Sequence, residues 1–445
     1  MKSMKQTVFL AALLLVIAQP LKVAAAGDAA ASAPLARTPA QGATTAIIGA
    51  RLLPVSGAPI EDGVLVMRGE RIVAVGASGT VAVPAEATRI DGRGMTVYPG
   101  LIDSDTSLGL AERDMDFADN DVAEAGQQIF PQARVVDAFN ADTVHIPVVR
   151  YNGITNAVVA PGDLTSLPGR SAFIQLHADD RRRMVVEPEL AMHVYLSSRV
   201  RREGGQFPGT RMGVVAQLRQ TLIDARAYLA DRKPGAPRDA RYEALAPYLD
   251  GSKPVVIAAS EGQDVDAALA LAREFKLKLI LGDLVYARDQ LDAVAASGAP
   301  VILGPIQLLP AANERYDAVY RLPAELQRRG VKFAFASGGV NIIGRFMYPR
   351  FAQTRNLPYL AAIAVAHGLP YDEALKGLTL YPAQIWGMDK DLGSLEVGKL
   401  ANLVIATGDP LQMATDVRQV FVRGVAVPMD SYQTRLRDQY GGVSP

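Results

Sequence analysis

The chain has 445 residues, in which 46 Lys and Arg balance 46 Asp and Glu. This neutral balance gives no reason to expect nucleic acid or an anionic membrane as a partner. The sequence contains no Cys, which excludes disulfides, thiolate catalysis and a lipid-anchored cysteine.

The first 26 residues have the pattern of a secretory signal peptide. Lys2 and Lys5 form a basic start, the apolar run "TVFLAALLLVIAQ" follows, and small residues up to Ala26 offer a cleavage site. We therefore predict a signal peptide at 1–26 and a periplasmic or secreted protein that leaves the membrane after cleavage. An uncleaved anchor is the alternative. Residues 27–44 are small and Pro-bearing and are expected to form a flexible leader.

Short apolar runs divided by Gly-bearing turns predict β-hairpins near both ends of the chain. They occupy residues 45–98, as in "DGVLVMRGERIVAVG", and residues 391–430, as in "VRQVFVRGVAV". Isolated hairpins are marginally stable and leave open edges. We therefore expect the two ends to pair in one small composite β-sandwich, followed by a tail at 431–445.

Between these ends, residues 99–390 alternate apolar strands with amphipathic helical segments. Such alternation is typical of parallel β/α units. Seven strands are predicted, and an eighth is expected within 184–215. The fold class is therefore α/β, a TIM-type (β/α)8 barrel, with an open sheet as the second choice. The seven strands are 100–103, 154–160, 171–177, 254–260, 277–283, 299–305 and 331–338.

Three motifs in this order resemble a known family. They are "VYPGLID" at 97–103, "GSLEVGK" at 393–399 and the strand beginning Asn402-Leu403-Val404. Together they resemble the amidohydrolase superfamily, in its imidazolonepropionase-like branch. The resemblance implies a TIM-type barrel with a composite β-sandwich. It also implies one or two divalent metals that activate water to hydrolyse non-peptide C–N bonds.

The positions at which this family places its metal ligands carry other residues here. The family has two His after the first strand, a Lys or Glu after the fourth, His after the fifth and sixth, and Asp after the eighth. No Lys occurs between Lys22 and Lys233. We therefore predict that the usual metal site is absent and that no cofactor is bound. Zinc or another divalent metal is expected only if other ligands replace the missing ones. The residues at the family positions are Asp105 and Ser107, Ala258 and Ser260, Gly282 and Asp283, and Ser337 and Gly338.

Several polar residues are candidates for a site at the barrel mouth. Asp105 and Asp283 follow the first and sixth strands, where carboxylates could form an acid/base pair or bind a hard cation. The alternative is that both cap the next elements or lie in solvent. His177, at the end of the third predicted strand, is a candidate for binding. So are Arg350, Arg355 and Tyr359, which follow the last strand and could line a pocket.

Three functions remain open. The first is an exported binding or structural subunit without catalysis, beside a catalytically complete amidohydrolase relative or a second copy of itself. The second is an active amidohydrolase with a non-standard site built from Asp105, Asp283 and His177. The third is a periplasmic binder of a small molecule.

Overall fold

The structure is a computed structural model that describes residues 42–112, 120–233, 235, 237–311, 314–338, 340–343 and 346–441. The side chains of 340–343 and 346–352 lie outside this description. The predicted signal peptide and nearly all of the predicted leader also lie outside the described residues. Within the described part of the chain, no helix is both long and apolar enough to span a bilayer.

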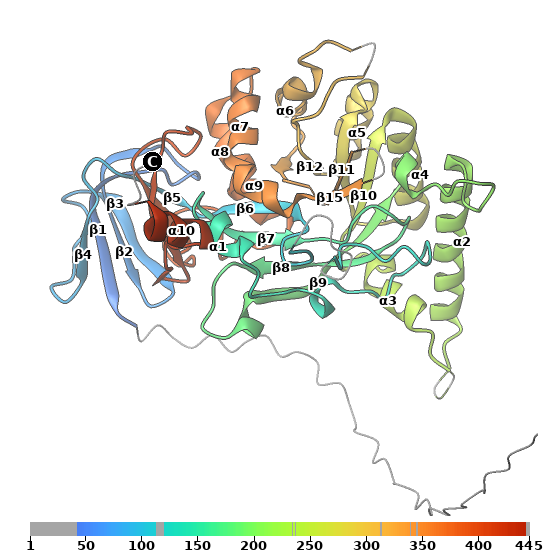
Figure 1. Ribbon diagram of the computed structural model, residues 1–445, viewed down its shortest axis with the longest axis horizontal. Coiled ribbons are helices and arrows are strands. Elements are labelled where there is room, and N and C mark those ends of the chain that lie inside the picture. The colour runs from blue at the N-terminus through green and yellow to red at the C-terminus, as the bar shows by residue number, and fades with distance from the viewer. Residues whose placement is uncertain are drawn as a thin grey trace, which may run out of the picture. The chain divides into compact units, whose positions relative to one another are not determined.

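The described residues form two eight-stranded sheets and one hairpin (Figure 1). The first, here called the terminal sheet, has the order β18-β17-β16-β5-β1-β2-β3, with β4 beside β1. Strands from the two ends of the chain meet where β16 runs antiparallel to β5. The terminal strands are β1 (Thr44–Leu52), β2 (Ile60–Arg68), β3 (Arg71–Ala77), β4 (Thr88–Asp91), β5 (Thr96–Pro99), β16 (Leu403–Ala406), β17 (Val417–Val422) and β18 (Val425–Ala426).

The second sheet, the barrel sheet, runs in chain order from β6 to β13. Its first and last strands meet through a parallel bridge between Thr106 and Gly338, where Gly338 N donates to Asp105 O at 2.9 Å. These contacts nearly close the barrel and confirm the predicted TIM-type fold. The strands are β6 (Leu101–Thr106), β7 (Ile154–Val159), β8 (Gly169–Gln175), β9 (Val185–Tyr195), β10 (Val255–Glu261), β11 (Leu279–Tyr286), β12 (Val301–Leu303) and β13 (Phe333–Phe335).

One strand departs from the expected parallel pattern. β8 is antiparallel to both β7 and β9, whereas the other neighbouring pairs in the barrel sheet are parallel. The connections that join β7, β8 and β9 are short and contain no α-helix, only the 3-10 helix η3 (Arg181–Met184) before β9, which permits antiparallel pairing. The eighth strand is β9, which lies inside the segment where it was expected. Because β8 is antiparallel to its neighbours, its carboxyl end lies beside the amino-terminal ends of the parallel strands.

Helices cover the outside of the barrel sheet (Figure 1). In α4, Val265, Ala268, Leu269 and Ala272 are buried at helical spacing, so one stripe packs onto the strands. The described helices are α1 (His145–Arg150), α2 (Arg211–Ala230), α3 (Ala240–Leu249), α4 (Gly262–Phe275), α5 (Leu291–Ser297), α6 (Ala318–Arg328), α7 (Leu357–Ala366), α8 (Tyr371–Leu378), α9 (Leu380–Ile385) and α10 (Tyr432–Tyr440). The hairpin β14 (Val340–Ile343) and β15 (Phe346–Pro349) and the 3-10 helix η6 (Arg350–Asn356) follow β13.

The interior of the barrel is filled by apolar side chains from successive strands. Ile102, Phe173, Val256 and Ile302 belong to one buried cluster, against which Trp386 packs just after α9. Because neighbouring residues of a strand point to opposite faces, these positions alternate with residues that contact the outer helices. The interior therefore has an apolar floor, and the polar residues gather at the carboxyl ends of the parallel strands.

Candidate binding site at the carboxyl ends of the barrel strands

A cavity of about 270 Å³ opens where the parallel strands end. Residues of β6, β9, β10, β11 and β12 and of the segments that follow these strands line it. Val256 and Ile302 contribute from the apolar cluster below, and Asp105, Ser260 and Asp283 lie near the strand ends. Polar side chains above an apolar floor are typical of small-molecule sites in this kind of fold.

The cavity contains the two aspartates that the sequence singled out. Asp105 lies in β6 and is half-buried, and its Oδ1 has no hydrogen-bond partner among the described residues. Burial raises the pKa of Asp105 well above its usual value, and the carboxylates of Asp283, Asp103 and Asp163 raise it further. The Asp105 carboxyl therefore holds a proton more tightly than an ordinary aspartate does.

Asp283 is held in a strained backbone. Its φ is 68° and that of Leu284 is 54°, so two successive non-glycine residues are left-handed within β11. Ser260 Oγ donates to Asp283 Oδ2 at 3.5 Å across the neighbouring strand. A side chain at Gly304 would begin 2.9 Å from Asp283 Oδ1, so this glycine makes room for the carboxylate. Asp283 and Gly304 both line the cavity, and the next helical element, η5 (Arg288–Gln290), has Ala287 and not Asp283 as its N-cap.

The sequence analysis missed His193, which also lines the cavity from β9. It is 1% exposed, and its Nε2 has no hydrogen-bond partner among the described residues. Burial lowers the pKa of His193 to about 3, so the ring is neutral at physiological pH. An unpaired buried polar atom costs about 1–3 kcal/mol. One sequence signal could have identified His193 as a lining residue. His193 lies two residues before Tyr195 in the same strand, so both side chains point to the same face of β9.

The other sequence candidates whose side chains the structure describes, His177, Arg355 and Tyr359, do not line the cavity. His177 follows the antiparallel β8 and lies beside Arg150, whose guanidinium approaches His177 Nδ1 at 3.4 Å at the end of α1. Asn152, just before β7, donates to the backbone oxygen of Arg355 and, at 3.3 Å, to the hydroxyl of Tyr359. The expected position of His177 at the mouth is therefore wrong, because β8 is reversed. Arg355 and Tyr359 contact Asn152 and do not line the cavity. The side chain of Arg350 lies outside the described residues.

The residues present do not fit the metal centre of the family. Ser107, Ser260 and Ser337 stand where imidazole or carboxylate ligands would be needed, and hydroxyl groups are poor substitutes for them. Within the described residues, no group of three or more His, Asp and Glu side chains is arranged to hold a metal ion. His193 and the aspartates share a cavity without converging on one point.

Comparisons with known proteins agree with this architecture. A model of the Amidohydrolase family matches residues 260–427. Amidohydrolase tasK of Hapsidospora irregularis is 24% identical over 386 residues, which are 77% of this chain and 37% of that protein. Imidazolonepropionase of Symbiobacterium thermophilum is 28% identical over 380 residues, which are 78% of this chain and 84% of that protein. The chain thus spans well under two thirds of tasK but most of the imidazolonepropionase.

A solved amidohydrolase from Thermotoga maritima MSB8 has the same fold. Its TM-score is 0.78 at 24% identity, over 86% of this chain and 99% of that one. The family match covers the second half of the barrel and the strands that return to the terminal sheet. The imidazolonepropionase match extends over most of the chain. Sequence and fold therefore lead to one conclusion: this chain is similar to the amidohydrolase superfamily in sequence, and it has the barrel fold of a solved amidohydrolase.

Proposed function

We propose that this chain is a ligand-binding member of the superfamily that no longer uses the family's metal centre. The observation that carries the proposal is the cavity itself. It is lined by carboxylates and one buried histidine, while serines occupy the strand ends that would supply metal ligands. A binding role needs the cavity and its polar groups, whereas metal-assisted hydrolysis also needs convergent ligands.

Elemental mass spectrometry on protein purified without chelator tests this proposal. We expect much less than one zinc, iron or manganese per chain, and no rise in thermal stability when zinc is added. About one tightly bound metal per chain, removed by chelator with a loss of stability, would overturn the proposal.

A second candidate is hydrolysis of C–N bonds without a metal. The observation in its favour is the raised pKa of Asp105 beside the carboxylate of Asp283, because two carboxyl groups that differ in protonation can act as acid and base. Turnover of small amides that persists with chelator and disappears in Asp105→Asn would favour this candidate over a binding role.

We further propose that the protein is exported and acts beside a catalytically complete relative or a second copy of itself. The signal-like residues 1–26 and the kept barrel without the usual ligands support this idea. Cross-linking in the native host, followed by mass spectrometry, should recover a second amidohydrolase or a cross-linked copy. Repeated recovery of neither would count against a partner.

A further inference from the structure

The cavity at the strand ends offers more hydrogen-bond acceptors than the protein satisfies. Five buried atoms on its lining have no hydrogen-bond partner among the described residues, and three of the five belong to carboxylates, which accept without donating when ionised. Most of the unmet capacity is therefore for a ligand that donates. The atoms are Asp105 Oδ1, Asp163 Oδ1, Asp264 Oδ2, His193 Nε2 and Ser197 Oγ.

The charges around the cavity also favour a positive ligand. Arg199 pairs with Asp163 at 2.6 Å, and Arg211 pairs with Asp264 at 2.6 Å. Asp105 forms no ion pair with any described residue, and the charged groups that act on it most strongly are other carboxylates. A cation beside Asp105 would replace this repulsion with attraction.

Aromatic side chains complete the lining. The hydroxyl of Tyr195 donates to Pro161 O at 2.7 Å, and the hydroxyl of Tyr286 donates to Leu309 O at 3.1 Å. Both tyrosines line the cavity, and these bonds anchor their rings. Aromatic faces attract ammonium groups and also accept the alkyl part of the same molecule.

We infer that the cavity binds a small organic cation that carries a protonated amine. Asp105 ionises beside the ammonium group and is its counter-ion, and His193 on β9 accepts or donates a hydrogen bond at the far end of the ligand. This inference rests on the proposed binding function. A metal ion fits less well, since its ligands must all lie about 2.0–2.6 Å from one point, and no such group exists among the described residues. An amine with an alkyl chain can reach acceptors that lie apart.

Isothermal titration calorimetry with four probes of known chemistry tests the inference. The probes are 1,5-diaminopentane, the neutral 1,5-pentanediol of equal length, the dianion glutarate, and zinc chloride. We expect the diamine to bind and the diol and glutarate to bind far more weakly. Asp105→Asn should weaken diamine binding by about 10- to 100-fold, the range for one charge-assisted hydrogen bond. Asp91→Asn, an exposed aspartate paired with Arg93 on β4, is the matched control and should bind like the wild type.

The comparison of diamine with diol uses the wild-type protein, so it holds even if Asp105→Asn fails to fold. Equal binding of diamine and diol, or preferential binding of glutarate, would overturn the inference. Failure of all four probes would also overturn it, while the proposed function would survive if purified protein carries no metal. Stoichiometric binding of zinc would overturn both.

Discussion

The buried carboxyl group of Asp103 forms hydrogen bonds that help to close the barrel, and it is not part of the cavity at the strand ends. It is fully buried in β6 and accepts from Ser337 N at 3.0 Å and from Ser337 Oγ at 2.5 Å. Ser337 is the second residue after β13, the last barrel strand. The contact between Asp103 and Ser337 therefore joins the first barrel strand to the last. Thr354 extends the network to Thr106 at 2.7 Å. Asp103 does not line the cavity, although the same motif supplies Asp105, which does.

The pH dependence of stability should report the burial of Asp103. Burial raises the pKa of Asp103 to about 7, although its hydrogen bonds oppose this. Between about pH 4 and 7, the folded chain keeps a proton that the unfolded chain releases, so stability falls as the pH rises through this window. Asp103→Asn should flatten this fall, by at most about 1.4 kcal/mol for each pH unit. Urea unfolding at pH 4.5 and 7.5 measures the difference.

Asp91→Asn is the control for this experiment. Its hydrogen bonds with Arg93 lower the pKa of Asp91 to about 2, below the window. The control should therefore keep the wild-type slope between pH 4.5 and 7.5. An unchanged slope in Asp103→Asn would show that this carboxyl does not keep its proton in the folded state.

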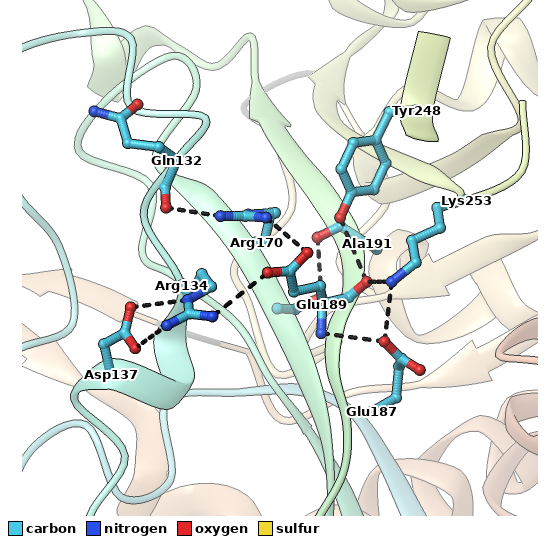
Figure 2. Close-up of polar contacts among 10 residues, drawn as sticks. Gln132, Arg134, Asp137, Arg170, Glu187, Glu189, Ala191, Tyr248 and Lys253 are labelled. Carbon is cyan, nitrogen blue, oxygen red and sulfur yellow. Dashed lines mark hydrogen bonds and ion pairs between the residues drawn. The ribbon is translucent and has the colours of Figure 1, made fainter. Parts of the chain in front are cut away.

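At the scale of elements, the antiparallel β8 is held by an ionic network on the outer side of the β8–β9 pair (Figure 2). Arg170 binds Glu189 at 2.7 Å and donates to Gln132 O at 2.8 Å. Arg134 contacts Glu189 at 3.6 Å and Asp137 at 2.6 Å. The side chain of Arg170 is only 9% exposed, so its charge depends on these partners. The network ties the loop before α1 to the reversed strand.

Replacing Arg170 should therefore destabilise the protein measurably. Arg170→Met keeps most of the side-chain volume but leaves Glu189 without its closest partner, and we expect a loss of about 2 kcal/mol in the free energy of unfolding. Arg93→Met removes an ion pair with Asp91 in which both side chains are largely exposed. That control should change stability by less than about 0.5 kcal/mol. Similar urea midpoints for the two variants would mean that the network contributes little.

At the scale of the whole molecule, Asn402 connects the terminal sheet to the barrel. Its backbone oxygen accepts from Gly100 N at 2.9 Å, between β5 and β6. Its side chain donates to Asn156 Oδ1 on β7 at 2.8 Å and accepts from Arg423 N at 2.7 Å. Asn402 is 5% exposed, so each of these groups needs its partner. Asn402 thus forms hydrogen bonds, through its backbone and its side chain, with residues from three other segments of the chain.

We expect Asn402→Ala to cost about 1–3 kcal/mol, because it removes the buried hydrogen bond to Asn156 and leaves the half-buried Arg423 N–H without an acceptor. Gln220→Ala, on the exposed face of α2, removes a surface hydrogen bond to Asp224 and serves as the control with little effect. Thermal unfolding of the two variants measures the contrast. Equal melting temperatures would show that the sheet and barrel are joined by their apolar packing and not by this amide.

The sequence by itself determined the fold class and the pairing of the two ends, and it named Asp105 and Asp283 as candidates for the barrel mouth. Each of these follows from local signals: strand-like runs, Gly-bearing turns, and the order in which polar residues follow apolar strands. Only the tertiary structure decided the direction of β8, and with it the separation of His177 from the cavity. It also showed that Arg355 and Tyr359 do not line the cavity. It also revealed His193. Strand direction depends on which distant segments pair and on the short connections between them, and residue patterns along one strand are the same in either direction.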